Sequence, residues 1–280
     1  MRKHYLTNKQ RDTLSVVIKC FIGLLFISPL FVGLVFSFVP DAELFKLPTF
    51  EVIRKTSSFD NYRTLIQSLP VFGYLRTSLI DCVLVITVQV VFSSLAAYSF
   101  AFFDFKGKNF LFTLVLIGMM VPAQVITITN FLTVRRLGLL NTYLGLAVIN
   151  FAGGKSLFLF RQYYKTLPRE MHEAAIVDGC GDMKYLFQFV MPLAVPSIAS
   201  VAIMVFIEEY NAYLWPILVA RKPNMYTIQV GINQLIRPDL LPTYGKLLAF
   251  AVISLVIPVL AFVIGEDYLI SGMTEGSVKG

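Results

Sequence analysis

The chain has 280 residues, of which 56% are hydrophobic and only 15% are charged, and its mean hydropathy is +0.71. These values lie outside the range of a soluble globular domain and indicate an integral membrane protein. The net charge of +7 does not indicate nucleic-acid binding, because the basic residues are scattered through predicted loops and form no patch interleaved with aromatic residues. We interpret them as flanks that meet anionic lipid head groups.

The N-terminal segment, residues 1–13, is basic, and an uncharged run from Cys20 to Val39 lies beyond it. This arrangement imitates a signal peptide. The run is too long for the apolar core of a signal peptide and lacks a small-residue cleavage site, so it predicts an uncleaved first span at about residues 14–39. The cluster of Lys and Arg ahead of it favours a cytoplasmic N-terminus.

Further apolar runs follow, with lengths close to the roughly 20 residues that cross a bilayer. We predict an all-α membrane protein with six spans, at about residues 14–39, 79–103, 110–134, 142–160, 196–219 and 247–267. These spans form one transmembrane domain, residues 14–269, with a C-terminal tail at residues 270–280. Pro122, Pro216 and Pro258 fall inside predicted spans, where we expect kinks because neighbouring helices satisfy the freed carbonyl groups.

The segment between spans four and five, residues 161–195, is the one stretch that does not suit lipid. Pro168 and Glu170 fit the first turn of a helix, and Gly179 is a natural helix end. A helix of about eleven residues is roughly 16 Å long, so we expect it to lie across the membrane face. Asp178 opposes the helix dipole and needs another role, such as capping the turn after it or contacting a partner.

Two further features of this segment bear on its contacts. Ala174 and Ala175 leave a smooth patch where another protein can approach closely, and Glu173 lies on a neighbouring charged face. Asp182 is predicted to cap a second helix that runs to Pro192.

Polar residues inside predicted spans are costly, at about 2.5–3.5 kcal/mol for a centred charge, so each must face protein or water. Glu208, Glu209 and Asn211, with Tyr210 among them, are therefore candidates to line a translocation path. Structural hydrogen bonds to other helices explain them equally well. Lys155 is expected near a helix break or beside a carboxylate. Asp81 and Gln89 in span two are weaker candidates for the path.

No catalytic constellation is visible. His4 and His172 lack Cys, Asp or Glu at zinc spacing, and the sequence contains neither a G-x-x-x-x-G-K-[ST] phosphate loop nor a G-x-S-x-G nucleophile turn. Cys20, Cys82 and Cys180 have no metal-ligand spacing and no obvious pairing. We expect a chain that is not an enzyme and that binds no metal or other cofactor.

The order Glu-Ala-Ala, two residues, Asp-Gly, and then a Phe and a Pro-x-x-x-Pro tail within residues 171–196 resembles the EAA loop of ABC importer permeases. Similarity to carbohydrate importer permeases, in particular the maltose-type second permease, covers nearly the full chain. The other matching stretches are Asn61-Tyr62, Ala97 to Lys108, Met120-Val121-Pro122, Leu137 to Thr142, Asn211 to Pro216 and Gly272 to Gly280. The departures are Thr77, Phe102, Asn130, Cys180 and Tyr210, where that family usually has Asn, Arg, Pro, Ala and Trp.

The resemblance implies a permease subunit of a sugar-class ABC importer in the bacterial cell membrane, with both termini cytoplasmic. It implies four kinds of partner: a second permease, two ATPase subunits that hold ATP and Mg, an extracellular solute-binding protein, and the sugar itself. The residues implied to couple to the ATPase are Glu173, Ala174, Ala175, Asp178 and Gly179. Those implied to contact it from the tail are Gly276 and Lys279.

Two alternatives remain open from the sequence. One is a secondary transporter driven by an ion gradient, with Glu208 or Glu209 as the proton carrier; it requires repeat symmetry and no cytoplasmic elbow. The other is an ABC importer permease for a non-sugar solute such as glycerol phosphate.

Overall fold

The computed structural model describes residues 8–44, 50–236 and 243–274, and all regular structure within these ranges is helical. The prediction of an all-α chain with several apolar helices is therefore confirmed. In chain order the elements are α1 (Asn8–Phe36), α2 (Asp41–Leu44), α3 (Phe50–Thr56), α4 (Asp60–Ser68), α5 (Val71–Phe102), α6 (Lys108–Met120), α7 (Ala123–Arg136), α8 (Tyr143–Ala147), the 3-10 turn η1 (Val148–Asn150), α9 (Gly154–Tyr164), α10 (Arg169–Val177), α11 (Asp182–Tyr185), the π-helical turn η2 (Leu186–Val190), α12 (Met191–Leu193), α13 (Val195–Tyr210), α14 (Leu214–Val219), the 3-10 turn η3 (Pro223–Met225), α15 (Ile228–Asn233) and α16 (Tyr244–Thr274).

Three stretches are long and apolar enough to cross a membrane as single helices: Ser15–Phe36, Val71–Phe102 and Tyr244–Glu266. Three pairs of helices pass the same test only together, because each pair is bent at a short break: Lys108–Met120 with Ala123–Arg136, Tyr143–Asn150 with Gly154–Tyr164, and Asp182–Leu193 with Val195–Tyr210. The described part of the chain thus has between three and six candidate spans.

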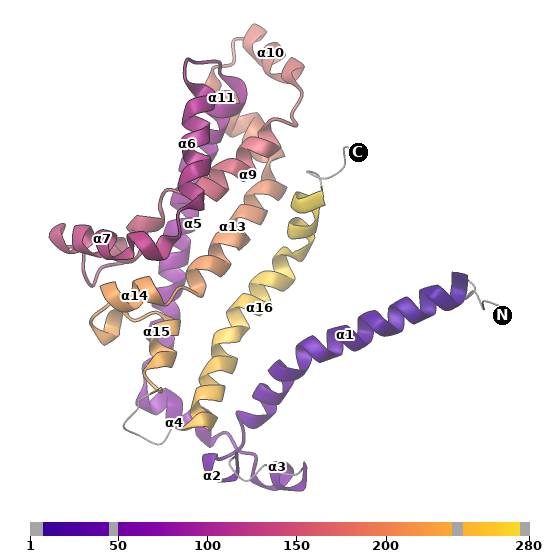
Figure 1. The fold of residues 1–280 in the computed structure, drawn as a ribbon, viewed down its shortest axis with the longest axis vertical. Helices are drawn as coiled ribbons and strands as arrows, with labels where there is room; N and C mark the ends of the chain where they lie inside the picture. The colour runs from indigo at the N-terminus through magenta and orange to yellow at the C-terminus, as the bar shows by residue number, and fades with distance from the viewer. Residues whose placement is uncertain (1–7, 45–49, 237–242, 275–280) are drawn as a thin grey trace. The chain divides into compact units, whose positions relative to one another are not determined.

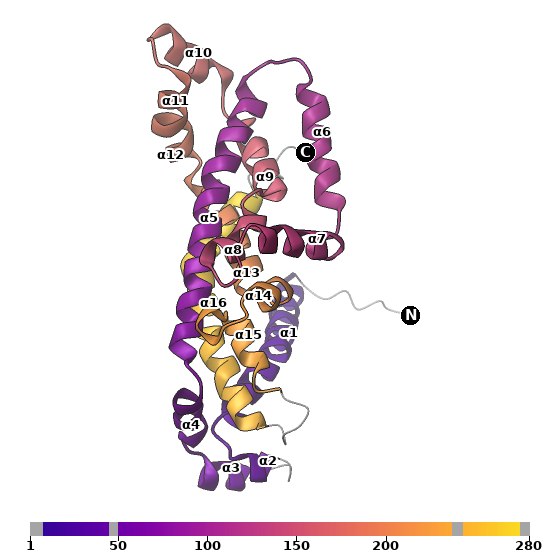
Figure 2. The ribbon, with the colours of Figure 1, turned by 90° about the vertical axis from the view of Figure 1, so that its left-hand side faces the viewer.

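The sharpest break separates α6 from α7, which meet at 96° where we expected one continuous helix over residues 110–134. Figure 2 shows α7 running across the direction of α6. Val121 is extended (φ −76°, ψ 120°), as expected for a residue before a proline, and Pro122 has no N–H to continue the helix. The proline therefore ends the helix rather than kinking it.

A second difference concerns predicted span five, residues 196–219. α13 begins at Val195, close to the expected start, but it ends at Tyr210, and the short helix α14 follows. The Asn211 side chain donates a hydrogen bond to the carbonyl oxygen of Ile207 (2.8 Å), and the Ala212 N–H bonds to Glu209 (3.1 Å) in a tightened last turn. Pro216 also disfavours a continuous helix, since its ring clashes with the carbonyl four residues earlier.

The chain divides into two compact units, Met1–Leu69 with Leu235–Ile253, and Pro70–Gln234 with Ser254–Gly280. In the first unit, Asn61 at the start of α4 donates hydrogen bonds to the carbonyl oxygens of Ser37 (2.9 Å) and Val39 (3.0 Å), just beyond α1. The Tyr62 hydroxyl lies 2.6 Å from the Ser37 hydroxyl. This pair of α4 residues therefore fixes the turn that follows α1, by bonding two of its carbonyl oxygens and the Ser37 hydroxyl.

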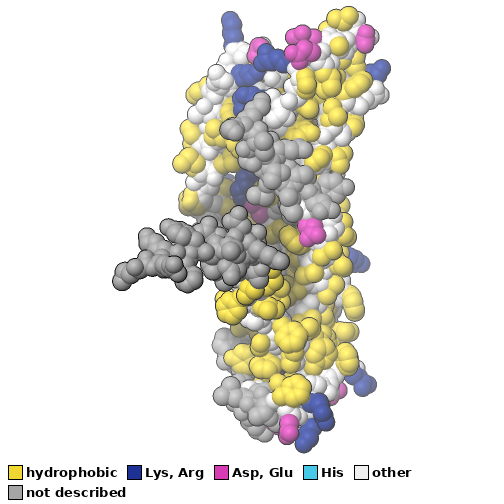
Figure 3. Space-filling view, turned by 90° about the vertical axis from the view of Figure 1, so that its right-hand side faces the viewer, with side chains coloured by type: hydrophobic (Ala, Val, Ile, Leu, Met, Phe, Trp, Pro, Cys, Tyr) yellow, Lys and Arg dark blue, Asp and Glu magenta, His cyan; other side chains and the backbone are white. Residues whose placement is uncertain are grey.

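The second unit is built around α5, along which α9 and α13 pack (Figure 1). The largest buried side chains of its core are Phe160, Tyr164 and Tyr185, which pack with residues of α5 and α13. On α6, by contrast, Phe110 and Leu114 are exposed. Figure 3 shows apolar side chains over much of the face it draws, interrupted by small groups of charged ones. Such apolar outer faces are expected to meet lipid or another membrane subunit.

A smaller core joins two of the stretches that resemble carbohydrate importer permeases, Leu137 to Thr142 and Asn211 to Pro216. The Trp215 indole N–H donates to the carbonyl oxygen of Leu146 (2.8 Å), and both residues belong to this core. Asn141 adopts the left-handed conformation (φ 58°), and its side-chain oxygen accepts hydrogen bonds from the backbone N–H groups of Arg221 and Lys222 at 2.7 and 2.9 Å. The two stretches therefore hold the loop after α14 in place.

Candidate functional site

The segment that the sequence singled out forms an elbow, defined here as residues 168–194. Its first helix, α10, begins directly after Pro168 and stops before Gly179, whose φ is +75°. The Gly179 N–H donates to the carbonyl of Ile176 (2.9 Å) and the Cys180 N–H to that of Ala175 (2.8 Å). This is the Schellman arrangement, in which a left-handed glycine satisfies the last carbonyls of a helix.

Asp178 is the last residue before this turn, and it is exposed. Its side chain makes no hydrogen bond within the part of the chain that the structure describes, so it does not cap the turn. Of the two roles considered for Asp178, contact with a partner is the one left open.

The faces of α10 differ in exposure. Glu173 and Ala174 are exposed, whereas Ala175 packs against the core of the second unit. At the end of the helix, Ile176 and Val177 are 55% and 86% exposed. The end of α10 therefore presents a small apolar surface beside the exposed Ala174. Sequence analysis overlooked this pair, although two apolar residues directly before Asp-Gly were a visible signal.

The elbow is tied to the end of α5 by His172. The His172 ring lies 4.9 Å from that of Phe102 and 4.8 Å from that of Tyr185, centroid to centroid, and Nε2 lies 3.3 Å from the Tyr98 hydroxyl. The Tyr98 hydroxyl donates to the Asp182 carboxylate (3.3 Å). The prediction that Asp182 caps the second helix is wrong, because Gly181 holds the cap position and the carboxylate faces α5.

A cavity of about 700 Å³ lies where α5, the α6–α7 break, the break before α9 and the end of α13 meet. Lys155 Nζ lies 2.6 Å from Glu208 Oε1, and Asn150 Nδ2 donates to Glu209 Oε2 (3.0 Å). The same four side chains line the cavity. Irregular backbone at membrane depth is tolerated where it is buried in protein or lines a water-filled cavity, so the breaks fit such a cavity.

Gln89 of α5 completes this polar lining. Its Nε2 donates to the Asn150 carbonyl (2.6 Å), and its Oε1 accepts from the Ser156 hydroxyl (2.7 Å). A Cβ on Gly153 would lie 2.1 Å from Gln89 Oε1, so a larger residue here would displace the Gln89 amide from its two hydrogen bonds. Sequence analysis singled out neither Asn150 nor Ser156, although both flank the Gly153-Gly154 pair that signals the helix break.

The four predicted path residues are not brought together. Glu208 and Glu209 line the cavity, but Tyr210 and Asn211 do not. Tyr210 is buried and its hydroxyl donates to the Ser254 carbonyl (2.8 Å). Asn211 is exposed and bonded only locally, as described above. Gly276 and Lys279 of the tail lie outside the described residues.

Lys155 lies one residue after the start of α9 and beside a carboxylate, as the sequence predicted. Its side chain and that of Glu208 are 57% and 49% exposed. An ion pair exposed to this extent contributes only about 0–1 kcal/mol to stability. Stabilisation of the fold is therefore not a sufficient reason for the Lys155–Glu208 pair. No group of three or more His, Cys, Asp or Glu side chains that could hold a metal occurs in residues 8–44, 50–236 and 243–274.

Residues 89–268 match the family model described as "Binding-protein-dependent transport system inner membrane component". The chain belongs to this family. The match includes the elbow, the cavity-lining residues and the helices between them. Family membership decides against the ion-gradient-driven alternative, and the chain is a permease subunit of an ABC importer.

Named relatives agree with the family model over nearly the whole chain. The permease is 33% identical to the arabinooligosaccharides transport system permease protein AraQ of Bacillus subtilis, with 92% of each chain covered. It is 30% identical to the sn-glycerol-3-phosphate transport system permease protein UgpE of Yersinia pestis, with 90% of this chain and 92% of the relative covered.

The fold is also found in a solved structure. A chain from the crystal structure of a bacterial ABC transporter involved in the import of the acidic polysaccharide alginate superposes with a TM-score of 0.81, covering 95% of this permease and 99% of that chain. At 20% identity this similarity supports the fold of the permease.

Proposed function

We propose that this permease takes part in the import of a sugar, with an oligosaccharide as the best-supported substrate class. The relative named for a sugar substrate, AraQ, is also the more similar of the two named above, at 33% against 30% identity. Both alignments cover at least 90% of this chain, so the ranking does not come from a single shared segment.

The assembly that we propose contains a second permease, two ATPase subunits and an extracellular solute-binding protein. The family description, a binding-protein-dependent system, supports the last of these. Within the described residues this chain has no counterpart of an ATP site: its glycine turns follow no strand, and its helices carry no phosphate loop. We propose, from family membership, that the ATPase partners hold ATP and Mg.

The elbow is proposed to be the element that an ATPase subunit moves. The observation that carries this proposal is the end of α10, where a glycine-capped helix presents exposed Ile176 and Val177 beside the small exposed side chain of Ala174. A small residue lets a partner approach the helix closely, and the apolar pair supplies area to bury. Glu173 and Asp178 would form the polar edge of this contact.

For the translocation path we propose the cavity lined by Lys155, Glu208 and Glu209. Its polar groups come from three different segments, so relative movement of these segments would change its opening. We further propose that the elbow and both termini are cytoplasmic, which agrees with the basic N-terminal segment, residues 1–13.

Purification of the tagged permease from its native membranes tests the assembly. We expect an ATP-hydrolysing subunit and a second permease to co-purify, and Ala174→Trp to lower the yield of the ATPase relative to the second permease. Recovery of the permease without any ATPase in several mild detergents would contradict the proposal.

The similarity to UgpE favours a second candidate substrate, a glycerol phosphate. The two candidates differ in charge, so the binding protein that co-purifies distinguishes them. We expect it to bind neutral arabinooligosaccharides and to ignore sn-glycerol 3-phosphate in calorimetric titrations. The opposite pattern would favour the second candidate and leave the proposed assembly intact.

A further inference from the structure

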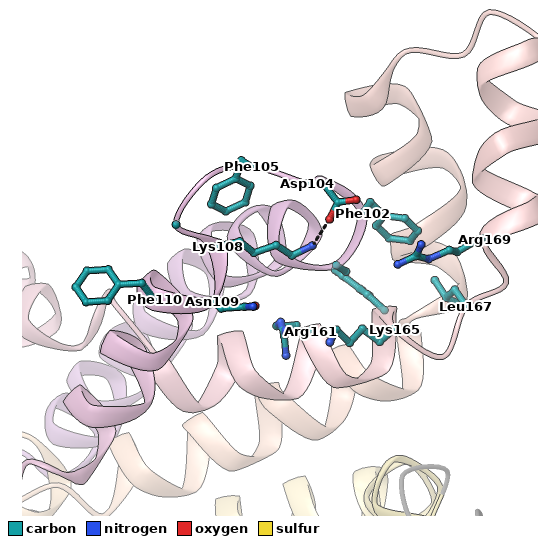
Figure 4. A pocket seen from close by; sticks show the side chains of 13 residues that line it. Phe102, Asp104, Phe105, Lys108, Asn109, Phe110, Arg161, Lys165, Leu167 and Arg169 are labelled. Carbon is teal, nitrogen blue, oxygen red and sulfur yellow. Dashed lines mark hydrogen bonds and ion pairs between the residues drawn. The ribbon is translucent and has the colours of Figure 1, made fainter.

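A second cavity, of about 610 Å³, lies between the α5–α6 turn and the end of α9, beside the start of α10 (Figure 4). Its volume falls in the range of small-molecule sites, about 300–1,000 Å³. Those sites are mostly apolar, whereas this one is lined by four basic residues and one acidic residue: Lys108, Arg161, Lys165, Arg169 and Asp104. We call it the basic cavity.

Only part of this charge is neutralised within the chain. Lys108 Nζ lies 3.2 Å from Asp104 Oδ1 and donates to the Phe103 carbonyl (2.6 Å). Asp104 is 90% exposed, so its carboxylate is well screened by water. Lys165 and Arg169 make no ion pair with any described residue. The cavity therefore keeps a surplus of positive charge.

Among these residues, Arg161 gives the strongest evidence for a bound anion. Arg161 is buried, at 8% exposure, and its guanidinium carbon lies 3.8 Å from the centre of the Phe112 ring. Its Nε is buried and has no hydrogen-bond partner among the described residues. Stacking on a ring satisfies the face of a guanidinium but leaves its N–H edge free for an acceptor. A buried cationic donor without an acceptor is costly, so an anion is expected to engage this edge.

Lys165 responds to the same surroundings. Although Lys165 is largely exposed, partial desolvation of its ammonium group lowers its pKa, and the nearby charges of Arg161, Lys108 and Arg169 lower it further. The four cations are close together because the end of α9 lies beside the first residues of α6 and α10. An anion bound among them would relieve this repulsion.

The rim of the basic cavity is apolar. Phe102, Phe105 and Phe110 line it, and Phe110 at the start of α6 is 66% exposed. α6 continues from there with exposed Leu111 and Leu114. A ligand with an anionic head and an apolar tail would place the head among the basic residues and the tail along α6. Basic pockets at the ends of membrane helices hold anionic lipid head groups in this way.

We propose that the basic cavity binds a phosphate group, carried by an anionic phospholipid head group or by free inorganic phosphate. Arg161 supplies the buried N–H donors, and Lys165 and Arg169 supply the remaining charge. Arg is suited to this role because its planar fork matches phosphate oxygens.

The test is native mass spectrometry of the purified transporter complex, titrated separately with phosphatidylglycerol, phosphatidylcholine and inorganic phosphate. We expect phosphatidylglycerol to be retained over phosphatidylcholine at one site, and Lys165→Gln and Arg161→Gln each to weaken it by about ten-fold or more. Lys106→Gln is the matched control, since Lys106 lies in the turn two residues before Lys108 but does not line the cavity. It should leave retention unchanged.

The separate titrations distinguish a lipid head group from free phosphate as the ligand. Binding of phosphatidylglycerol alone, lost in the two variants, assigns the site to lipid; binding of inorganic phosphate with the same variant dependence assigns it to free phosphate. Lys165 is exposed and its variant is expected to fold even if Arg161→Gln does not. The proposal is overturned if Lys165→Gln binds all three probes as the unaltered complex does. It is also overturned if that variant loses an ATPase subunit while retaining lipid, because the cavity would then be a protein interface.

Discussion

Tyr98 on α5 donates a hydrogen bond of 3.3 Å to Asp182, the first residue of α11. The central helix of the second unit is thus joined to the elbow through side chains, in addition to the chain that connects them. His172 contributes a second link, because its ring packs against Phe102 of α5 and against Tyr185. Side chains of both α10 and α11 therefore contact α5.

Removing this link should loosen the elbow in graded steps. Tyr98→Phe deletes the hydroxyl contacts with Asp182 and His172 but keeps the ring, and we expect a loss of about 1 kcal/mol in stability. Tyr98→Ala also removes a buried ring and should cost about 3–5 kcal/mol. Thermal unfolding of the purified complex measures both. Tyr213→Phe is the control, since no described residue hydrogen-bonds the Tyr213 hydroxyl; an equal loss in Tyr213→Phe and Tyr98→Phe would argue against the link.

The glycine that ends α10 should tolerate few replacements. Gly179→Val forces a β-branched residue to φ +75°, at a cost of roughly 1 kcal/mol or more, and should abolish uptake at normal membrane levels of the permease. Gly179→Asn should retain part of the uptake, because Asn tolerates this conformation. Gly181→Val is the matched control: Gly181 has φ −72°, and a Cβ there meets nothing within 4 Å. Equal uptake in the two valine variants would contradict this role of the turn.

Charge exchange in the Lys155–Glu208 pair tests whether the cavity that these residues line is part of the translocation path. Lys155→Glu and Glu208→Lys should each reduce uptake strongly, because each places like charges where the two side chains now lie 2.6 Å apart. Stability should change by about 1 kcal/mol or less, as expected for half-exposed charges. The double exchange restores opposite charges and should recover part of the uptake, measured with labelled substrate in intact cells. A double variant as inactive as the single ones would show that the pairing itself is unimportant.

Orientation can be checked with single cysteines in a background where Cys20, Cys82 and Cys180 are replaced. Glu170 in the elbow and Asn224 in η3 are both exposed. In intact cells an impermeant thiol reagent should label Asn224→Cys and spare Glu170→Cys, and both should react after the membrane is opened. Labelling of Glu170→Cys from outside would reverse the proposed orientation.

Sequence patterns predicted the parts of the fold whose cause is local. Pro168 and Gly179 bound α10 because each acts on its own backbone, and the apolar runs marked the long helices. Pro122 shows the limit: a proline in an apolar run either kinks or ends a helix, and packing decides which. The cavity required contacts between residues about 60 positions apart, such as Gln89 with Asn150. The exposure of each helix residue also depends on tertiary packing, so the sequence pattern could not show that Ala174 is exposed while Ala175 packs against the core.

The central claim is that α10 transmits the state of an ATPase to the spans. The most direct measurement is ATP hydrolysis by the reconstituted transporter, with and without its substrate-loaded binding protein, for Ala174→Trp and Val177→Asp. Both positions are exposed, so the permease should fold and assemble in the membrane. We predict that stimulation by the binding protein and substrate uptake are both lost, while basal hydrolysis by any retained ATPase persists. Stimulation and uptake at unaltered levels in both variants would contradict the claim.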